Sequence, residues 1–147
     1  MSDSFATWTE LEAHLATISQ RFQERWQSPT GNNCFRFAYP HAGEEWGVFF
    51  VHNELPSGTA WVFVGVRVAA SSQFDFATLM PEIPRGPVGA LSLAHEYVCV
   101  SHNLPIRGLR PADLRLVIDE LCELAKYCQS RAAAPASAGA AFAHLID

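Results

Sequence analysis

Lysine is almost missing from this 147-residue chain. Lys126 is the only lysine, and charged residues make up 17% of the sequence, against roughly a quarter in an average soluble domain. Ten basic and fifteen acidic residues leave a formal net charge of −5 at pH 7. Because the sequence has no run of basic residues that could neutralise phosphates, it predicts no binding of nucleic acid or of an anionic membrane.

The chain also has no long hydrophobic run. Its longest uncharged apolar stretch, residues 59–66, is much shorter than the roughly 20 residues that a membrane helix needs. The N-terminal residues do not show the basic segment followed by an apolar segment that is typical of a secretory signal. We therefore expect a cytoplasmic protein.

Short motifs for catalysis or metal binding are missing as well. The six histidines have neither H-E-x-x-H nor H-x-x-x-H spacing, and the four cysteines form no C-x-x-C pair. There is no G-x-S-x-G motif and no glycine-rich phosphate loop. We therefore expect no enzymatic activity, no metal and no cofactor. The cysteines are expected to be small buried hydrophobic residues: Cys34, Cys99, Cys122 and Cys128.

The first part of the chain predicts a helix followed by a three-stranded meander. Thr7 and Glu10 have the spacing of a capping box, and apolar residues then recur every three or four positions from Trp8 to Trp26. This pattern predicts a helix that ends before Ser28. Strand-like runs follow at residues 34–39, 45–52 and 59–69, and their short turn-rich separators favour antiparallel pairing.

The second part predicts a short helix at residues 74–80, two strands within residues 89–104 around a tight turn near residues 94–96, and a long helix from Pro111. The expected fold is therefore α+β, an antiparallel five-stranded sheet with two long helices and one short helix in the order α-β-β-β-α-β-β-α. Residues 1–130 form one domain, and residues 131–147 form a flexible tail whose end, 141–147, could dock as one helical turn. The apolar stripe of the last helix comprises Leu114, Val117, Ile118, Leu121, Leu124, Ala125 and Cys128.

The third strand is apolar on both faces, which is unusual for an antiparallel sheet with one wet face. Residues 62, 64, 66 and 68 are all valine, and the other face carries Trp61, Phe63, Gly65 and Arg67. If the helices cover the valines, the second face is a candidate interaction surface. In the alternative arrangement, Trp61 and Phe63 face the helices and a loop layer covers the valines.

The element order and the stretch GALSLAHEYVCVSHNLPIRGLRPADLRLVIDELCELA, residues 89–125, carry a family resemblance. There, a strand pair runs into a short loop and an amphipathic helix. Over residues 8–128 the chain resembles the class I type III secretion chaperones (the Tir-chaperone group) and the YbjN-like proteins. One departure is that Arg110 precedes the last helix, where family members often have Ser, Thr or Asp.

The resemblance to the secretion chaperones implies a cytosolic homodimer without catalytic residues that holds an extended segment of a client protein, such as a secreted effector. Two alternatives remain: a YbjN-like regulatory or stress-linked protein without a secreted client, and a small-molecule-binding or enzymatic domain that uses Arg36, Arg67 and a histidine. The residues expected to contact a partner are Trp61, Phe63 and Arg67, with Phe35, Phe37 and Trp46 adding to the same surface.

Overall fold

The described part of the chain folds into one antiparallel sheet with two α-helices. The computed structural model describes residues 3–75, 88–94 and 96–131, and in this part of the chain the sheet has six strands in the order β1-β2-β3-β4-β6-β5. The predicted α+β class is confirmed, but the sheet has one strand more than expected. The elements are α1 (Trp8–Ile18), β1 (Glu24–Gln27), β2 (Asn33–His41), β3 (Glu44–Glu54), β4 (Ala60–Ala70), a 3-10 turn (Ser71–Gln73), β5 (Ala90–Ala94), β6 (Tyr97–Pro105) and α3 (Pro111–Arg131).

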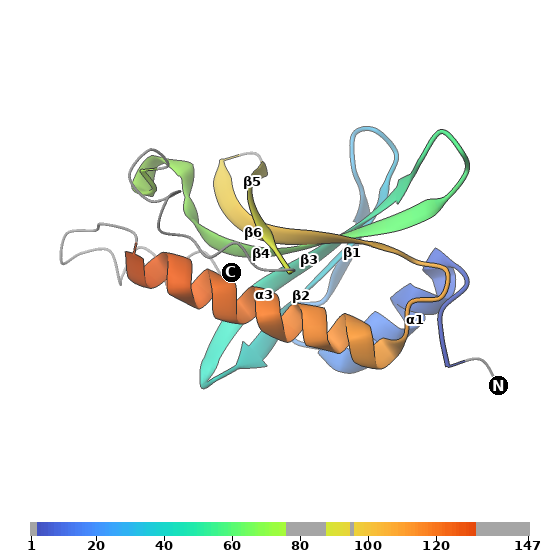
Figure 1. Ribbon diagram of the computed structural model, residues 1–147, viewed down its shortest axis with the longest axis horizontal. Helices are drawn as coiled ribbons and strands as arrows, with labels where there is room; N and C mark the ends of the chain where they lie inside the picture. The colour runs from blue at the N-terminus through green and yellow to red at the C-terminus, as the bar shows by residue number, and fades with distance from the viewer. Residues whose placement is uncertain (1–2, 76–87, 95, 132–147) are drawn as a thin grey trace.

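Both helices pack on the same face of the sheet. Figure 1 shows α3 running across the strands, with α1 near its N-terminal end. The apolar stripes of α1 and α3 form one continuous core with the valines of β4. Leu11, Leu15, Leu114 and Leu121 are completely buried in it. The stripe predicted for α3 is confirmed, apart from Leu124, which stays partly exposed while Cys122 is buried.

The strand register decides which face of β4 meets the helices. Phe35 pairs with Phe50, and Phe50 pairs with Val64, so these side chains form one row on the helix-covered face. The valines of β4 are completely buried there. The alternative in which Trp61 and Phe63 face the helices is therefore wrong.

The start of α1 confirms Thr7 as the N-cap of the predicted capping box, but Glu10 bonds back to Ala6 and not to Thr7. The backbone N–H of Glu10 donates to Thr7 Oγ1 at 3.3 Å, and Glu10 Oε2 accepts from the backbone N–H of Ala6 at 2.8 Å. The return bond therefore falls one residue before the N-cap. The bond to Thr7 satisfies one of the backbone donors that a helix start leaves without partners.

The predicted length of the first helix is wrong, because α1 ends at Ile18 and the chain then turns into β1. Ser19 is extended, its hydroxyl donates to the carbonyl of Ala38 at 2.6 Å, and Phe22 has a positive φ of 53°. Beyond this bend, Trp26 pairs with Cys34. The helical spacing of apolar residues continues to Trp26, but the chain pairs with the edge of β2 there. Backbone hydrogen bonds to β2 therefore decide the structure of this segment, and the local apolar pattern does not.

The C-terminal half follows the predicted order. Ala94 pairs with Tyr97, which confirms the tight turn, and α3 begins at Pro111 as expected. Arg110, the unusual residue before α3, donates from Nε to Asp113 Oδ2 at 3.0 Å. Phe74 and Asp75 are not helical, and the rest of the predicted short helix lies outside the described residues. Arg131, the first residue of the predicted tail 131–147, is the last residue of α3, and the remainder of that tail lies outside the described residues. Within the described part, no helix is long and apolar enough to cross a membrane.

Candidate functional site

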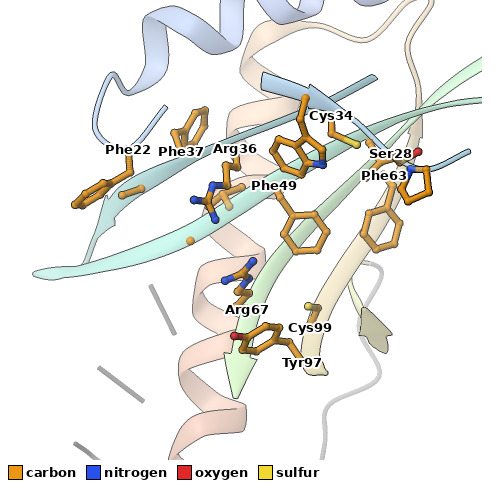
Figure 2. A pocket seen from close by; sticks show the side chains of 16 residues that line it. Phe22, Ser28, Cys34, Arg36, Phe37, Phe49, Phe63, Arg67, Tyr97 and Cys99 are labelled. Atoms are coloured by element: carbon orange, nitrogen blue, oxygen red, sulfur yellow. The ribbon is translucent and has the colours of Figure 1, made fainter. Parts of the chain in front are cut away.

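The sheet face opposite α1 and α3, here called the second face, carries a hollow. The hollow has a volume of about 320 Å³ and is shown in Figure 2. Its floor includes Ala38 and Gly47, which pair across β2 and β3 and have almost no side chain to fill the space. Large side chains from four strands and from the bend before β1 stand around this floor: Phe22, Trp26, Phe49, Phe63 and Tyr97.

Two arginines extend into this pocket. Figure 2 shows the guanidinium groups of Arg36 and Arg67, which come from β2 and β4, directed into the same space. Arg36 Nε lies 2.7 Å from Glu24 Oε2, although the two groups are not aligned as a hydrogen bond. The Arg67 guanidinium lies 4.5 Å from the ring centroid of Tyr97. Among the described residues, no carboxylate lies within ion-pair distance of Arg67, so the pocket is electropositive in an otherwise acidic chain.

Two thiols also border the pocket, and both are neutral near pH 7. Burial raises the pKa of Cys99 to about 11, against the opposing effect of the nearby Arg67 charge. Burial also raises the pKa of Cys34. A nucleophilic cysteine needs a lowered pKa, so these two residues act here as apolar lining. All four cysteines are buried and unpaired, which confirms the predicted structural role.

The structure separates the predicted partner-contacting residues into two groups. Phe63 and Arg67 line the pocket. Trp61 lies on the same face, and its buried indole N–H has no hydrogen-bond partner among the described residues. The partner-binding role of these three residues stays a prediction.

The other three predicted contact residues are buried in the core. Phe35, Phe37 and Trp46 are exposed by 0%, 2% and 2%. Successive side chains of a strand point to opposite faces, so Arg36 reaches the pocket while its two aromatic neighbours face the helices. The prediction that these aromatics add to the second surface is therefore wrong, although Phe37 borders the cavity at its floor.

Several aromatic residues of the pocket are not among the contact residues predicted from the sequence. Phe22 and Trp26 were assigned to the stripe of a longer helix, and Phe49 was part of a strand with no assigned facing. Side chains of residues 45–52 alternate between the two faces of the sheet. Trp46, Val48 and Phe50 share the helix-covered face, so this alternation places Phe49 on the second face. Tyr97 gave no comparable signal, since its contact with Arg67 depends on the pairing of β4 with β6.

A second polar cluster joins the end of β2 to α3. The Tyr39 hydroxyl donates to Asp119 Oδ1 at 2.5 Å and accepts from Arg115 Nε at 2.6 Å. His41 Nε2 lies 2.8 Å from Glu123 Oε1. Burial and the bond to Asp119 raise the pKa of Tyr39 to about 12, against the opposing effect of Arg115. These side chains interact with one another, so the cluster connects β2 to α3.

The described lining of the pocket contains no histidine. In the whole described part of the chain, no group of three histidine, cysteine, aspartate or glutamate side chains is placed to hold a metal ion. The site therefore offers cationic and aromatic recognition, without a general base or a set of metal ligands among its described side chains.

Comparison with known proteins gives no family assignment. No protein-family model matches the chain, and no curated protein matches it in sequence. The resemblance to the secretion chaperones and the YbjN-like proteins therefore stays a prediction.

Proposed function

We propose that this chain is a non-catalytic binding protein and that its partner binds in the pocket of the second face. One observation carries the proposal: two arginines and several large aromatic side chains surround a hollow on the face opposite the helices. Aromatic and arginine side chains are the residue types that concentrate binding energy at interfaces. The lining thiols are neutral, which leaves the pocket without a nucleophile among its described cysteines.

The first candidate partner is an extended segment of a client protein, as the resemblance to the secretion chaperones suggests. Trp61 and Phe63 are partly buried on the second face, where they would contact apolar side chains of such a segment. The exposed four-residue strand β1 forms one edge of the sheet, and an extended peptide can add to an edge strand through backbone hydrogen bonds. We propose that the chain is also a homodimer, because pairing is the commonest way to cover an apolar surface.

A second candidate partner is a small molecule, and the shape of the site favours it. The hollow is bounded by aromatic walls and has the volume of a small ligand site, at the lower end of the roughly 300–1,000 Å³ typical of such sites. Both arginines that sequence analysis assigned to a small-molecule alternative, Arg36 and Arg67, line it. No described feature favours a YbjN-like regulatory role in particular.

The substitution Phe63→Glu tests the binding role of the second face. Phe63 is only partly buried, so the variant should keep the circular dichroism spectrum of the folded domain and lose self-association in sedimentation, or lose the proteins that the unaltered chain captures from a native lysate. Leu55→Glu is the matched control, because Leu55 is 44% exposed in a turn and should tolerate the charge.

Two results would count against the proposal. An unfolded Phe63→Glu variant would show that Phe63 is part of the core, since a buried unpaired carboxylate costs several kcal/mol. A folded variant that still associates and still captures the same partners would show that the partner binds elsewhere.

A further inference from the structure

We propose that the pocket of the second face binds a small amphipathic carboxylate. The carboxylate lies between the guanidinium groups of Arg36 and Arg67, and the apolar body of the ligand lies against Phe49 and Phe63. This inference rests on the second candidate function, in which the pocket takes a small molecule.

The charge of the pocket indicates an anion. The chain carries a net charge of −5, yet both guanidinium groups are directed into one hollow. Arg67 is held by the Tyr97 ring and has no carboxylate partner among the described residues. A guanidinium group presents its donors as a planar fork that matches the two oxygens of a carboxylate. An anionic ligand would therefore be the charge partner that Arg67 lacks among the described residues.

The amount of charge indicates a monoanion. Glu24 Oε2 lies 2.7 Å from Arg36 Nε and offsets part of the charge of Arg36. The two arginines and this one carboxylate together leave about one positive charge at the pocket, which a single carboxylate balances. A phosphate dianion would bring a second negative charge close to Glu24, and like charges at short range repel.

The walls indicate an apolar body of limited size. The rings of Phe49 and Phe63 have centroids 5.7 Å apart and are tilted by 37°, so they form an angled apolar wall. Trp26 approaches from β1, and the neutral thiols of Cys34 and Cys99 add to the apolar lining. A volume of about 320 Å³ suits a ligand with one ring or a short alkyl chain.

The test is isothermal titration calorimetry of the full chain with three matched probes: 4-phenylbutyrate, 4-phenylbutanol and 4-phenylbutylamine. The acid should bind at least about tenfold more tightly than the alcohol, because the charge-assisted hydrogen bonds form only with the anion. The amine should bind most weakly. Arg67→Gln should reduce the affinity for the acid to that for the alcohol, and Arg67→Lys should restore part of the preference. Arg107→Gln is the control, because Arg107 is exposed and does not line the pocket.

A second measurement avoids the risk that an Arg67 variant fails to fold. In the unaltered chain, 4-phenylbutyrate should shift the backbone amide NMR signals of Gly47 and Phe63 more than those of Arg107. Equal affinity for the acid and the alcohol, no binding of the acid at millimolar concentration, or shifts confined to other regions would each overturn the proposal. Displacement of the acid by lower concentrations of inorganic phosphate would overturn the assignment of a monoanion.

The outcome can be separated from that of the proposed function. If 4-phenylbutyrate does not bind but Phe63→Glu still abolishes association or capture, the second face is a protein-binding surface and only the small-carboxylate inference fails. If the acid binds and Phe63→Glu has no effect on association, the client candidate fails and the small-molecule candidate stands.

Discussion

The ring of Phe49 lies over Gly65 of the neighbouring strand. The two residues are direct partners in the pairing of β3 with β4, and a Cβ placed on Gly65 would be only 2.3 Å from Phe49 Cζ. The glycine therefore lets the ring lie close to the sheet, where it forms one wall of the pocket. A strand glycine of this kind marks a close approach, and here the approaching group is an aromatic ring.

Gly65→Ala should consequently displace the Phe49 ring. We expect a loss of about 1–3 kcal/mol in the free energy of unfolding, as is usual when a side chain is forced into a packed site. Urea denaturation measures this loss. In a Phe49→Ala background the same substitution should cost much less, since the ring is gone. An equal cost in both backgrounds would show that Gly65 is constrained by something other than Phe49.

The packing of α3 gives a second prediction. Leu121 is completely buried between the helix and the sheet, so Leu121→Ala should lower the free energy of unfolding by about 2–5 kcal/mol. Leu116 lies on the same helix and is 57% exposed, which makes Leu116→Ala the matched control. Similar denaturant midpoints for the two variants would contradict the packing of α3 on this face.

The contrast between α3 and β1 shows which parts of the fold could be predicted. Pro111 and the regular apolar stripe after it are local signals, and they predicted the start and the buried face of α3 correctly. The residues of β1 continue the helical spacing of α1, and only the neighbouring edge of β2 turns them into a strand. Such tertiary pairing cannot be inferred from local periodicity, and the extra strand was missed for this reason.

Tyr39 should make the domain sensitive to alkaline pH. Its pKa is raised to about 12, mainly by burial and then by its hydrogen bond to Asp119, whereas an unfolded tyrosine titrates near 10. The folded state thus favours the neutral hydroxyl, so this contribution is complete below about pH 10 and is lost as the pH rises towards 12. Chemical denaturation at several pH values should show this decline.

Tyr39→Phe separates this effect from those of the cysteines. Cys99, Cys122 and Cys128 also have pKa values raised by burial, and they are present in both proteins, so the difference between the two stability profiles reports Tyr39 alone. Near pH 7 the variant should lose about 1.5–3 kcal/mol, as is usual for hydrogen bonds to charged groups, because the Tyr39 hydroxyl bonds to Asp119 and Arg115. Parallel profiles between pH 10 and 12 would rule out Tyr39 as the source of the decline.

The turn between β2 and β3 contains a correctable strain. His41 pairs with Glu44, and the two residues between them have positive φ angles, 52° at Ala42 and 80° at Gly43. A two-residue turn of this type favours Asn at its first position, because Asn tolerates the left-handed conformation better than Ala. Ala42→Asn should raise the free energy of unfolding by about 0.5–1 kcal/mol. Ala42→Val should lower it, and thermal melts that rank the two variants in the opposite order would contradict the turn geometry.

The candidate site was only partly predictable. Trp61, Phe63 and Arg67 could be placed on one face because valine occupies every second position from residue 62 to residue 68, and their strand was recognised correctly. The same reasoning, applied without a register for β2, placed Phe35 and Phe37 on the second face, whereas both lie in the core. The hollow itself depends on small residues from two strands meeting across the sheet, as Ala38 and Gly47 do, and the sequence does not state that they are neighbours.

The central position of β4 has a consequence for the exchange of amide hydrogens with solvent. This strand is bonded to β3 on one side and to β6 on the other, and its valines are completely buried. Each of its amides donates to one of these two strands, so exchange needs an opening inside the sheet, whereas β1 has a single neighbour and four exposed residues. In deuterated water, the amides of Val62, Val64 and Val66 should therefore be among the last to exchange, and those of β1 among the first.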